Sequence, residues 1–262
     1  MHDVSRKRLR GRNRLMAPPW IRCPRPIAGA RVRLYCIPHA GGGASAFRTW
    51  TTALPGVEVR PVQLPGREDR IGEPPLRTAH EITGPLTDAL QTDLSGEWAL
   101  FGHSMGALVG FEVLRELRRR GAAEPVHFFA SGHRAPHLPD PDPPMHALPD
   151  AEFLDALDER YGGVPAAVRE SEELLELLLP GLRADVAVCD TYVHHPEAPL
   201  DCALTALGGE SDGGVGRDEL EAWREQTRGA FRLEMFPGDH FYLQQRPEDV
   251  LGVISAALGS GG

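Results

Sequence analysis

Long hydrophobic runs are missing from this sequence. A membrane-spanning helix needs about 20 consecutive apolar residues, and no segment of the chain approaches that length. The arginine-rich beginning is not followed by the apolar stretch of a secretory signal peptide. From these absences we expect neither a membrane protein nor a secreted one, but a cytoplasmic protein.

Cysteine is scarce, and metal and cofactor motifs are absent. The four cysteines form no CxxC pair, so we expect reduced thiols, with Cys36 and Cys202 as small buried residues of strand-like segments. The sequence has no HExxH motif and no Cys/His cluster at metal-ligand spacing. The glycines at 41–43 are followed by no GK[ST] and lack GxGxxG spacing. We therefore expect no metal and no cofactor.

The formal net charge of −9 is unevenly distributed along the chain. Residues 1–25 hold eight basic residues and one acidic residue, which leaves 20 basic and 36 acidic residues in the remainder. An acidic body argues against nucleic acid as the main partner. We interpret residues 1–16 as a disordered basic leader, with RNA or membrane contact as the alternative, and residues 17–262 as one domain.

Apolar segments that resemble strands alternate with helical patterns. This alternation is typical of an α/β fold with a mostly parallel sheet that helices cover on both faces. The expected strands are 31–38, 56–64, 97–102, 125–132, 200–209 and 231–238. The expected helices are 45–54, 78–94, 105–120, 217–228 and 247–258.

Residues 138–197 interrupt the alternation between the fourth and fifth strands. They begin with a proline-rich segment and continue with acidic helical patterns. We interpret them as a helical lid, because ligands of open α/β sheets bind beyond the carboxyl ends of the strands. The alternative is a helical layer that only stabilises the sheet.

The segment 99–113, ALFGHSMGALVGFEV, places Ser104 between two glycines at the end of an apolar strand. The following helix has Leu108, Phe111, Leu114 and Leu117 on one face. A Gly-x-Ser-x-Gly turn from a strand into a helix is typical of a nucleophilic serine. The alternative is a tight turn that happens to contain a serine.

A serine hydroxyl needs a base, and the base needs an orienting acid. On an α/β-hydrolase sheet these residues occur in the order Ser, Asp or Glu, His. Asp212 directly follows the fifth expected strand and His240 the sixth. Order and position together predict Ser104, Asp212 and His240 as a catalytic triad.

Other histidines and acids compete for these roles. His103 flanks the serine but should point away from it, His127 lies within a strand, and His194 and His195 should face solvent. Asp239 adjoins His240 and cannot easily reach its neighbour's ring. The remaining acids, which are more typical of helix caps or solvated surface, are Asp201, Glu210 and Asp218.

An oxyanion hole requires two N–H donors. The backbone N–H of Met105 follows the nucleophile and opens a helix. The second donor should come from the loop after the first strand, PHAGGGASAF (38–47), where Ala40 is the candidate. Glycines there permit close approach of the backbone to a substrate, although a plain strand-to-helix turn would look the same.

Several motifs together resemble the type II thioesterases, stand-alone editing hydrolases of polyketide and nonribosomal peptide assembly lines. The similarity covers roughly 17–258. It is carried by PPWIRCPRP, RLYCIPHAGGGASAFRTW, VQLPGREDRIGEPP, FGHSMGALVGFEV, LPGLRADVAVCDTY, ALGGESD and MFPGDHFYL. The basic leader and the glycine-rich SDGGVG segment depart from the family pattern.

This resemblance implies an α/β-hydrolase fold, the same triad and the same oxyanion donors. The implied substrate is an acyl thioester on the phosphopantetheine arm of an acyl or peptidyl carrier protein, and a monomer is expected. We further predict that Arg67 and Arg70 meet an acidic carrier surface; the alternative is that both form ordinary surface ion pairs. Two rival functions are a general carboxylesterase or lipase, and a non-catalytic hydrolase fold that binds carriers.

Overall fold

The computed structural model describes residues 20–259 of the chain, apart from 163 and 165. The expected basic leader, 1–16, lies outside the described residues.

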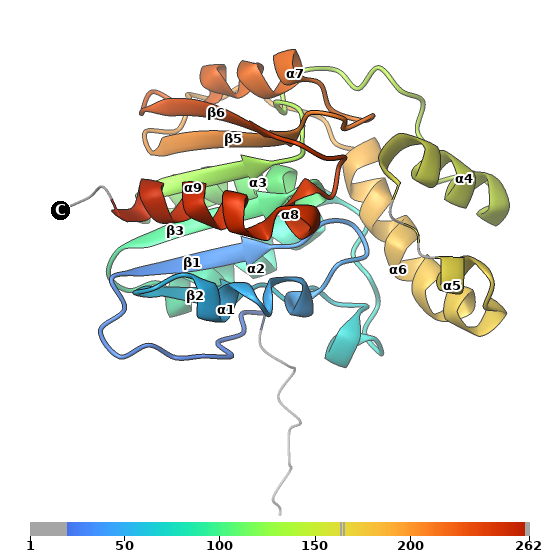
Figure 1. Ribbon diagram of the computed structural model, residues 1–262, viewed down its shortest axis with the longest axis horizontal. Coiled ribbons are helices and arrows are strands. Elements are labelled where there is room, and N and C mark those ends of the chain that lie inside the picture. The colour runs from blue at the N-terminus through green and yellow to red at the C-terminus, as the bar shows by residue number, and fades with distance from the viewer. Residues whose placement is uncertain (1–19, 163, 165, 260–262) are drawn as a thin grey trace, which may run out of the picture.

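Six strands of the described chain form one parallel sheet in the order β2-β1-β3-β4-β5-β6 (Figure 1). All six expected strands are confirmed. Their bounds are Val32–Ile37 (β1), Val57–Pro61 (β2), Trp98–His103 (β3), His127–Ser131 (β4), Ala203–Gly209 (β5) and Phe231–Phe236 (β6). Every residue of β3 and β4 is buried, which explains the consecutive apolar residues at the centre of each strand.

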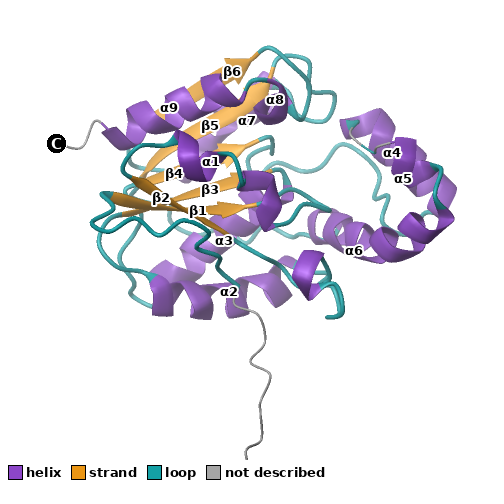
Figure 2. Cartoon of the chain, turned by 60° about the horizontal axis from the view of Figure 1, so that its bottom comes forward, coloured by secondary structure: helices purple, strands orange, loops and turns teal. Residues whose placement is uncertain are grey.

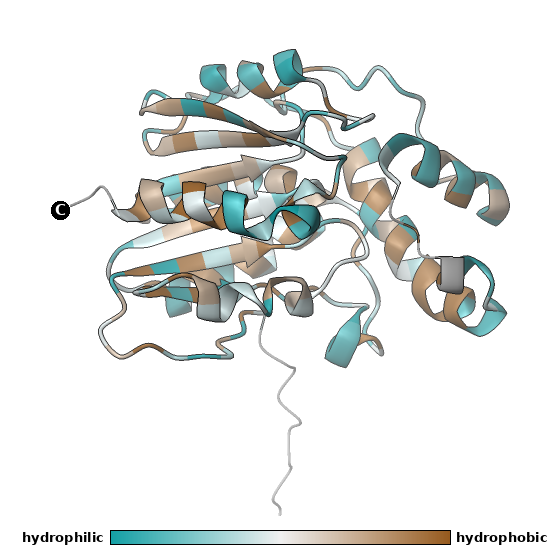
Figure 3. Cartoon of the chain, in the orientation of Figure 1, coloured by the Kyte–Doolittle hydropathy of each residue, from teal (hydrophilic) through white to brown (hydrophobic). Residues whose placement is uncertain are grey.

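Helices cover both faces of the sheet (Figure 2). On one face lie α2 (Ala79–Asp93), α3 (Met105–Arg119) and α7 (Arg217–Glu221), and on the other α1 (Trp50–Ala53), α8 (Tyr242–Gln245) and α9 (Pro247–Gly259). The hydropathy colouring in Figure 3 shows both polar and apolar residues along these helices. Within the described chain, the buried apolar residues accordingly form a separate core on each side of the sheet.

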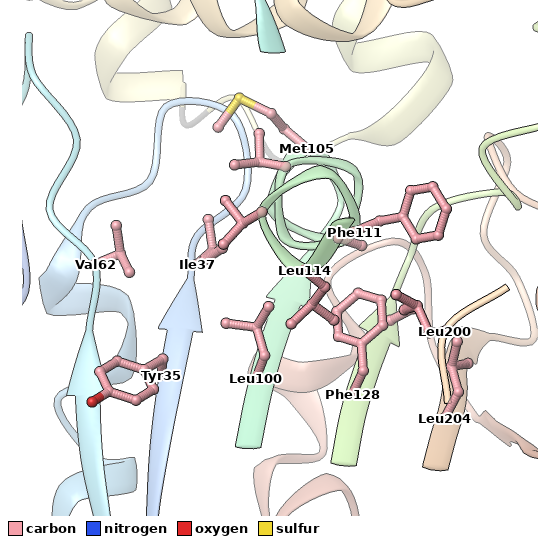
Figure 4. Packing of buried hydrophobic residues seen from close by; sticks show 14 of the residues in the cluster. Tyr35, Ile37, Val62, Leu100, Met105, Phe111, Leu114, Phe128, Leu200 and Leu204 are labelled. Carbon is pink, nitrogen blue, oxygen red and sulfur yellow. The ribbon is translucent and has the colours of Figure 1, made fainter. Parts of the chain in front are cut away.

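Helix α3 is the centre of the larger core. The four residues predicted to share one face, Leu108, Phe111, Leu114 and Leu117, are all buried. The Phe111 ring packs edge-on against Trp223 at a centroid distance of 5.6 Å. Figure 4 shows Phe111 and Leu114 of α3 above Leu100 and Phe128 of the sheet. This packing fixes the start of α3, and with it the position of Ser104.

The insertion between β4 and β5 is helical, as predicted. It contains α4 (Asp150–Tyr161), α5 (Ala166–Arg169) and α6 (Glu172–Asp190), which lie beyond the carboxyl ends of the strands (Figures 1 and 2). Its own small core includes Phe153 of α4 and Val186 of α6.

Two expected helices are shorter than predicted, and the short helix α8 was not predicted. The segment 45–54 divides into a 3₁₀ turn, Ala44–Phe47, and α1, and 217–228 divides into α7 and a 3₁₀ turn, Ala222–Gln226. The hydroxyls of Thr51 and Thr52, both within α1, bond back to main-chain carbonyls, which competes with regular helix. Helix α8 has four residues, too few to produce a periodic pattern.

The cysteines agree with the sequence expectations. All four cysteines are free, and Cys36 and Cys202 are buried. Among the described residues, no helix has the length and apolar character needed to cross a bilayer.

We expect His127 to make stability depend on pH. Burial and, less strongly, Arg232 lower the pKa of His127 to about 4, while the unfolded chain binds the proton near 6.5. The free energy of unfolding should therefore fall as the pH drops from about 6.5 to about 4, with this residue contributing up to about 3 kcal/mol. His127→Gln should remove that contribution, because glutamine does not titrate. An amide was chosen because it can offer a hydrogen-bonding partner to the Thr205 hydroxyl, which now bonds Nε2 at 2.8 Å. Urea unfolding of both proteins at pH 7.5 and 4.5 measures the difference; equal pH dependence would contradict the prediction.

Candidate active site

Ser104 occupies a strained turn between β3 and α3. Its backbone φ of 55° and ψ of −123° lie in a region that costs a non-glycine residue about 1–3 kcal/mol. The N–H of Ser104 donates to the Ser131 carbonyl at 2.7 Å, and its own carbonyl accepts from Ala107 at 2.8 Å. These bonds hold the serine at the tip of the turn, where it lines a cavity.

The two glycines around Ser104 are required by close contacts between β3, α3 and β1. A Cβ on Gly102 would lie 2.1 Å from the carbonyl oxygen of Gly106. A Cβ on Gly106 would lie 2.3 Å from the carbonyl oxygen of Ile37. Backbone atoms cannot move aside as a flexible side chain can, so both positions exclude every residue with a side chain.

Gly106→Ala is accordingly expected to destabilise the protein by about 3 kcal/mol, because β1 and α3 must separate to admit the methyl group. The matched control is Gly84→Ala in α2, where a Cβ meets nothing within 4 Å. That change should stabilise the helix by about 0.5–1 kcal/mol. Urea unfolding measures both; a loss below about 1 kcal/mol for Gly106→Ala would show that the turn tolerates a side chain.

Asp212 and His240 form a buried pair, as the sequence predicted. Asp212 follows β5 and His240 follows β6, the neighbouring strand. Nδ1 of His240 lies 2.8 Å from Oδ2 of Asp212, and the two side chains are 2% and 1% exposed. The other carboxylate oxygen accepts the N–H of Gly214 at 2.9 Å. The Asp212 carboxylate accepts a hydrogen bond from Nδ1 and so keeps the ring proton on that nitrogen. Nε2 is then unprotonated and can accept a proton. The His240 ring lines the cavity.

The cavity has a volume of about 1110 Å³ and lies between the strand ends and the helical insertion. Ser104 and His240 line it together with the loop after β1 and residues of α4 and α6. Within the described chain, the Ser104 hydroxyl donates no hydrogen bond to protein. It is therefore free to meet a ligand in the cavity.

The competing histidines have other contacts. His103 is fully buried, with Nδ1 2.9 Å from the Ser131 hydroxyl, and burial together with nearby His240 holds its pKa well below the usual value. His127 is packed within β4, as expected. His195 is exposed, but the prediction for His194 is wrong: it is half-buried, stacks on Phe111 and lines the cavity.

The competing acids do not reach His240. Asp239 accepts from the backbone N–H of Phe241 at 2.8 Å and from the side chain of Gln245 at 2.9 Å. Asp201 forms an exposed ion pair with Arg228. Glu210 and Asp218 are exposed.

Both predicted oxyanion donors are available. Ala40 lines the cavity in the turn that follows β1, and Met105 is the first residue of α3, at the positive end of the helix dipole. Among the described residues, neither backbone N–H donates to another protein group. The two amides are thus free to bind a negatively charged oxygen.

The prediction that Arg67 and Arg70 face a carrier protein is wrong, because both side chains are buried. Arg67 forms a bidentate ion pair with Asp185 at 2.5 and 2.7 Å. Arg70 pairs with Glu73 at 2.6 Å and lies over the Trp20 ring. Their donors are used inside the protein, so neither guanidinium is available to a docked partner.

Tyr161, at the end of α4, is a site residue that the sequence analysis missed. Its ring lies 4.7 Å from that of His240, centre to centre. A Cβ on Gly214 would come within 2.4 Å of the Tyr161 ring, so the glycine-rich segment after Asp212 makes room for this contact. Burial raises the pKa of the Tyr161 phenol, which keeps it neutral beside the histidine.

A serine in a strained turn after a central strand, with an acid and a histidine after later strands, defines the α/β-hydrolase class. A family model described as "Thioesterase domain" matches residues 32–258. The chain therefore belongs to the thioesterase family and is a thioester hydrolase.

Individual relatives agree with this assignment. The chain is 44% identical to linear gramicidin dehydrogenase LgrE of Brevibacillus parabrevis over 92% of this chain and 93% of the relative. The RedJ thioesterase of the prodiginine pathway in Streptomyces coelicolor is 40% identical and has a TM-score of 0.81; the match covers 90% of this chain and 92% of RedJ. The type II thioesterase BorB of the borrelidin cluster is 35% identical and has a TM-score of 0.81; the match covers 91% of this chain and 96% of BorB. LgrE carries the name of a dehydrogenase. The assignment as a hydrolase therefore rests on the family model and on the two thioesterase structures.

Proposed function

We propose that this chain is a stand-alone type II thioesterase that removes acyl groups from the phosphopantetheine arms of carrier proteins. Its task would be to clear stalled or mis-primed units from a polyketide or nonribosomal peptide assembly line. The observation that carries the proposal is the buried Asp212–His240 pair in the wall of a large cavity that also contains Ser104. RedJ is a thioesterase of the prodiginine biosynthetic pathway and BorB is a type II thioesterase of the borrelidin biosynthetic cluster, and these two relatives support the substrate class.

In the acylation step, Nε2 of His240 takes the proton of the Ser104 hydroxyl as Oγ attacks the thioester carbon. Asp212 holds the imidazole in the required tautomer and stabilises the imidazolium that forms. The N–H groups of Ala40 and Met105 bind the oxyanion. Collapse of this intermediate breaks the carbon–sulfur bond, and the imidazolium gives its proton to the departing thiolate.

Deacylation repeats the sequence with water as the nucleophile. His240 takes a proton from water, hydroxide attacks the ester carbon, and the proton passes to Ser104 Oγ as the free acid departs. Each step uses groups of the chain and water, so we propose that the reaction needs no metal or cofactor and that the enzyme acts as a monomer.

Three substrates with the same acyl group test the proposal: a carrier-bound thioester, a free pantetheine thioester and an oxygen ester. We expect kcat/KM for the carrier substrate to exceed that for the free thioester by at least about tenfold, because binding of the remote carrier is used at the reacting centre. Equal rates with the oxygen ester would favour a general esterase. No turnover of any substrate would favour a non-catalytic carrier-binding protein.

A further inference from the structure

The buried carboxylate of Asp185 contacts the loop that carries Ala40, although Asp185 belongs to the helical insertion. It lies in α6 and is fully buried. Oδ2 accepts the backbone N–H of Gly41 at 2.7 Å, and the two oxygens also accept the Arg67 guanidinium. Burying a carboxylate costs free energy unless its oxygens accept hydrogen bonds. Loss of the Gly41 hydrogen bond would therefore be unfavourable, which keeps Gly41 in this position. The chemical steps above do not use Asp185.

Gly41 is the third residue of a turn that spans 39–42. The N–H of Gly42 donates to the His39 carbonyl at 2.9 Å, and Gly41 has a φ of 77°. A positive φ at this position is the mark of a type II turn, in which the central peptide is flipped relative to a type I turn. The N–H of that central peptide belongs to Gly41. By accepting it, Asp185 favours the type II form over the type I form.

The rest of the loop is held in a similar way. The carbonyl of Gly42 accepts from Arg67 at 3.2 Å, the N–H of Ala44 donates to the Gln63 side chain at 2.9 Å, and the N–H of Ser45 donates to Glu68 at 3.1 Å. These bonds hold the loop through the segment 63–68 and through α6. The N–H of Ala40 is left for the cavity.

We propose that Asp185 is a positioning residue for the oxyanion hole. Its bond to Gly41 fixes the turn whose first peptide bears the Ala40 N–H, and so directs that donor toward the reacting carbonyl. The inference rests on the proposed function, since it requires Ala40 to bind an oxyanion. It also couples the helical insertion to the chemistry, because the anchored part of α6 holds a donor of the catalytic site in place.

Two double variants separate this role from stabilisation of the fold. Both remove the ion pair by Arg67→Met, and they differ only at Asp185. Asp185→Asn keeps an oxygen that accepts the Gly41 N–H, whereas Asp185→Leu removes it but packs better in an apolar setting. A purely structural role therefore predicts that the leucine variant is at least as active as the asparagine variant, since unpaired polar groups cost stability when buried.

Our inference predicts the opposite order. Relative to the asparagine variant, the leucine variant should have kcat lowered by about 10- to 100-fold with KM within about threefold. Its affinity for an alkylboronic acid, which forms a tetrahedral adduct on a nucleophilic serine, should fall by a similar factor. Equal kcat and equal boronate affinity in the two variants, or an effect on KM alone, would overturn the inference.

Two further comparisons keep the test decisive. Relative to the native protein, the asparagine variant has lost the ion pair and the Arg67–Gly42 bond but keeps the Gly41 contact, so its kcat should fall by less than about 10-fold; a larger loss would assign the effect to Arg67 instead. This comparison stands even if the leucine variant does not fold. Ser104→Ala in the same assay examines the proposed function separately. If Ser104→Ala abolishes turnover while the double variants are equal, only the role of Asp185 fails.

Discussion

Ser104→Ala is expected to lower kcat/KM for a carrier-bound acyl thioester by at least about 10³-fold. The variant keeps the cavity, the oxyanion donors and the Asp212–His240 pair, but it has no hydroxyl to form the acyl-enzyme. The residual rate should reflect attack by water alone in the prepared site. Release of the carrier thiol, followed with a thiol-reactive dye, measures the change.

The matched control is Ser255→Ala in α9, on the face of the sheet opposite α3. It deletes the same hydroxyl at a half-buried position and should leave kcat/KM within about twofold, because the position lies away from the site. Turnover by Ser104→Ala at more than a tenth of the native rate would contradict the assigned nucleophile.

Asp212→Asn is expected to lower kcat by about 10³- to 10⁴-fold. An amide in place of the carboxylate donates to Nδ1 and leaves the ring proton on Nε2, where it blocks acceptance of the serine proton. The imidazolium of the transition state also loses its negative partner. KM should change little, because Asp212 is buried against His240 and does not line the cavity.

Asp239→Asn provides the matched control in the adjoining residue. Its carboxylate bonds only Phe241 and Gln245 among the described residues, so kcat should stay within about threefold of native. A loss of activity for Asp239→Asn as large as that for Asp212→Asn would mean that the acid of the triad is misassigned.

The sequence was sufficient to predict the sheet and the positions of Ser104, Asp212 and His240 after its strands, because both follow from chain order. In a parallel sheet the carboxyl ends of all strands lie at one edge. Ser104, Asp212 and His240 each follow a strand, so finding the strands was enough to bring these residues together. The required glycines of the turn also belong to one short segment and needed no distant information.

The burial of Arg67 was not predictable in this way. In sequence it lies between turn-forming and charged residues, which is typical of a surface loop. Its partner Asp185 is 118 positions away, in a helix whose packing depends on the whole insertion. The sequence did contain a signal for a buried ion pair. Asp185 is surrounded by apolar residues, with Ala184 before it and Val186 and Val188 after it. An acid within an apolar helical segment is rarely buried without a partner.

The contact between Tyr161 and the segment after Asp212 illustrates the same limit. The glycine-rich segment was visible as a departure from the family pattern. Its physical reason is the ring of Tyr161, which occupies the place of a side chain at Gly214. No local pattern could have joined two segments that meet only after the insertion folds over the sheet.

The most direct test of a serine thioesterase mechanism is to identify the acyl-enzyme. The native protein would be mixed with an acyl-loaded carrier protein, quenched in acid within milliseconds, digested and analysed by mass spectrometry. The mechanism predicts the acyl mass on the peptide that contains Ser104, with one free carrier thiol released for each acyl group found there. An acyl group on another residue, or thiol release that continues unchanged in Ser104→Ala, would contradict it.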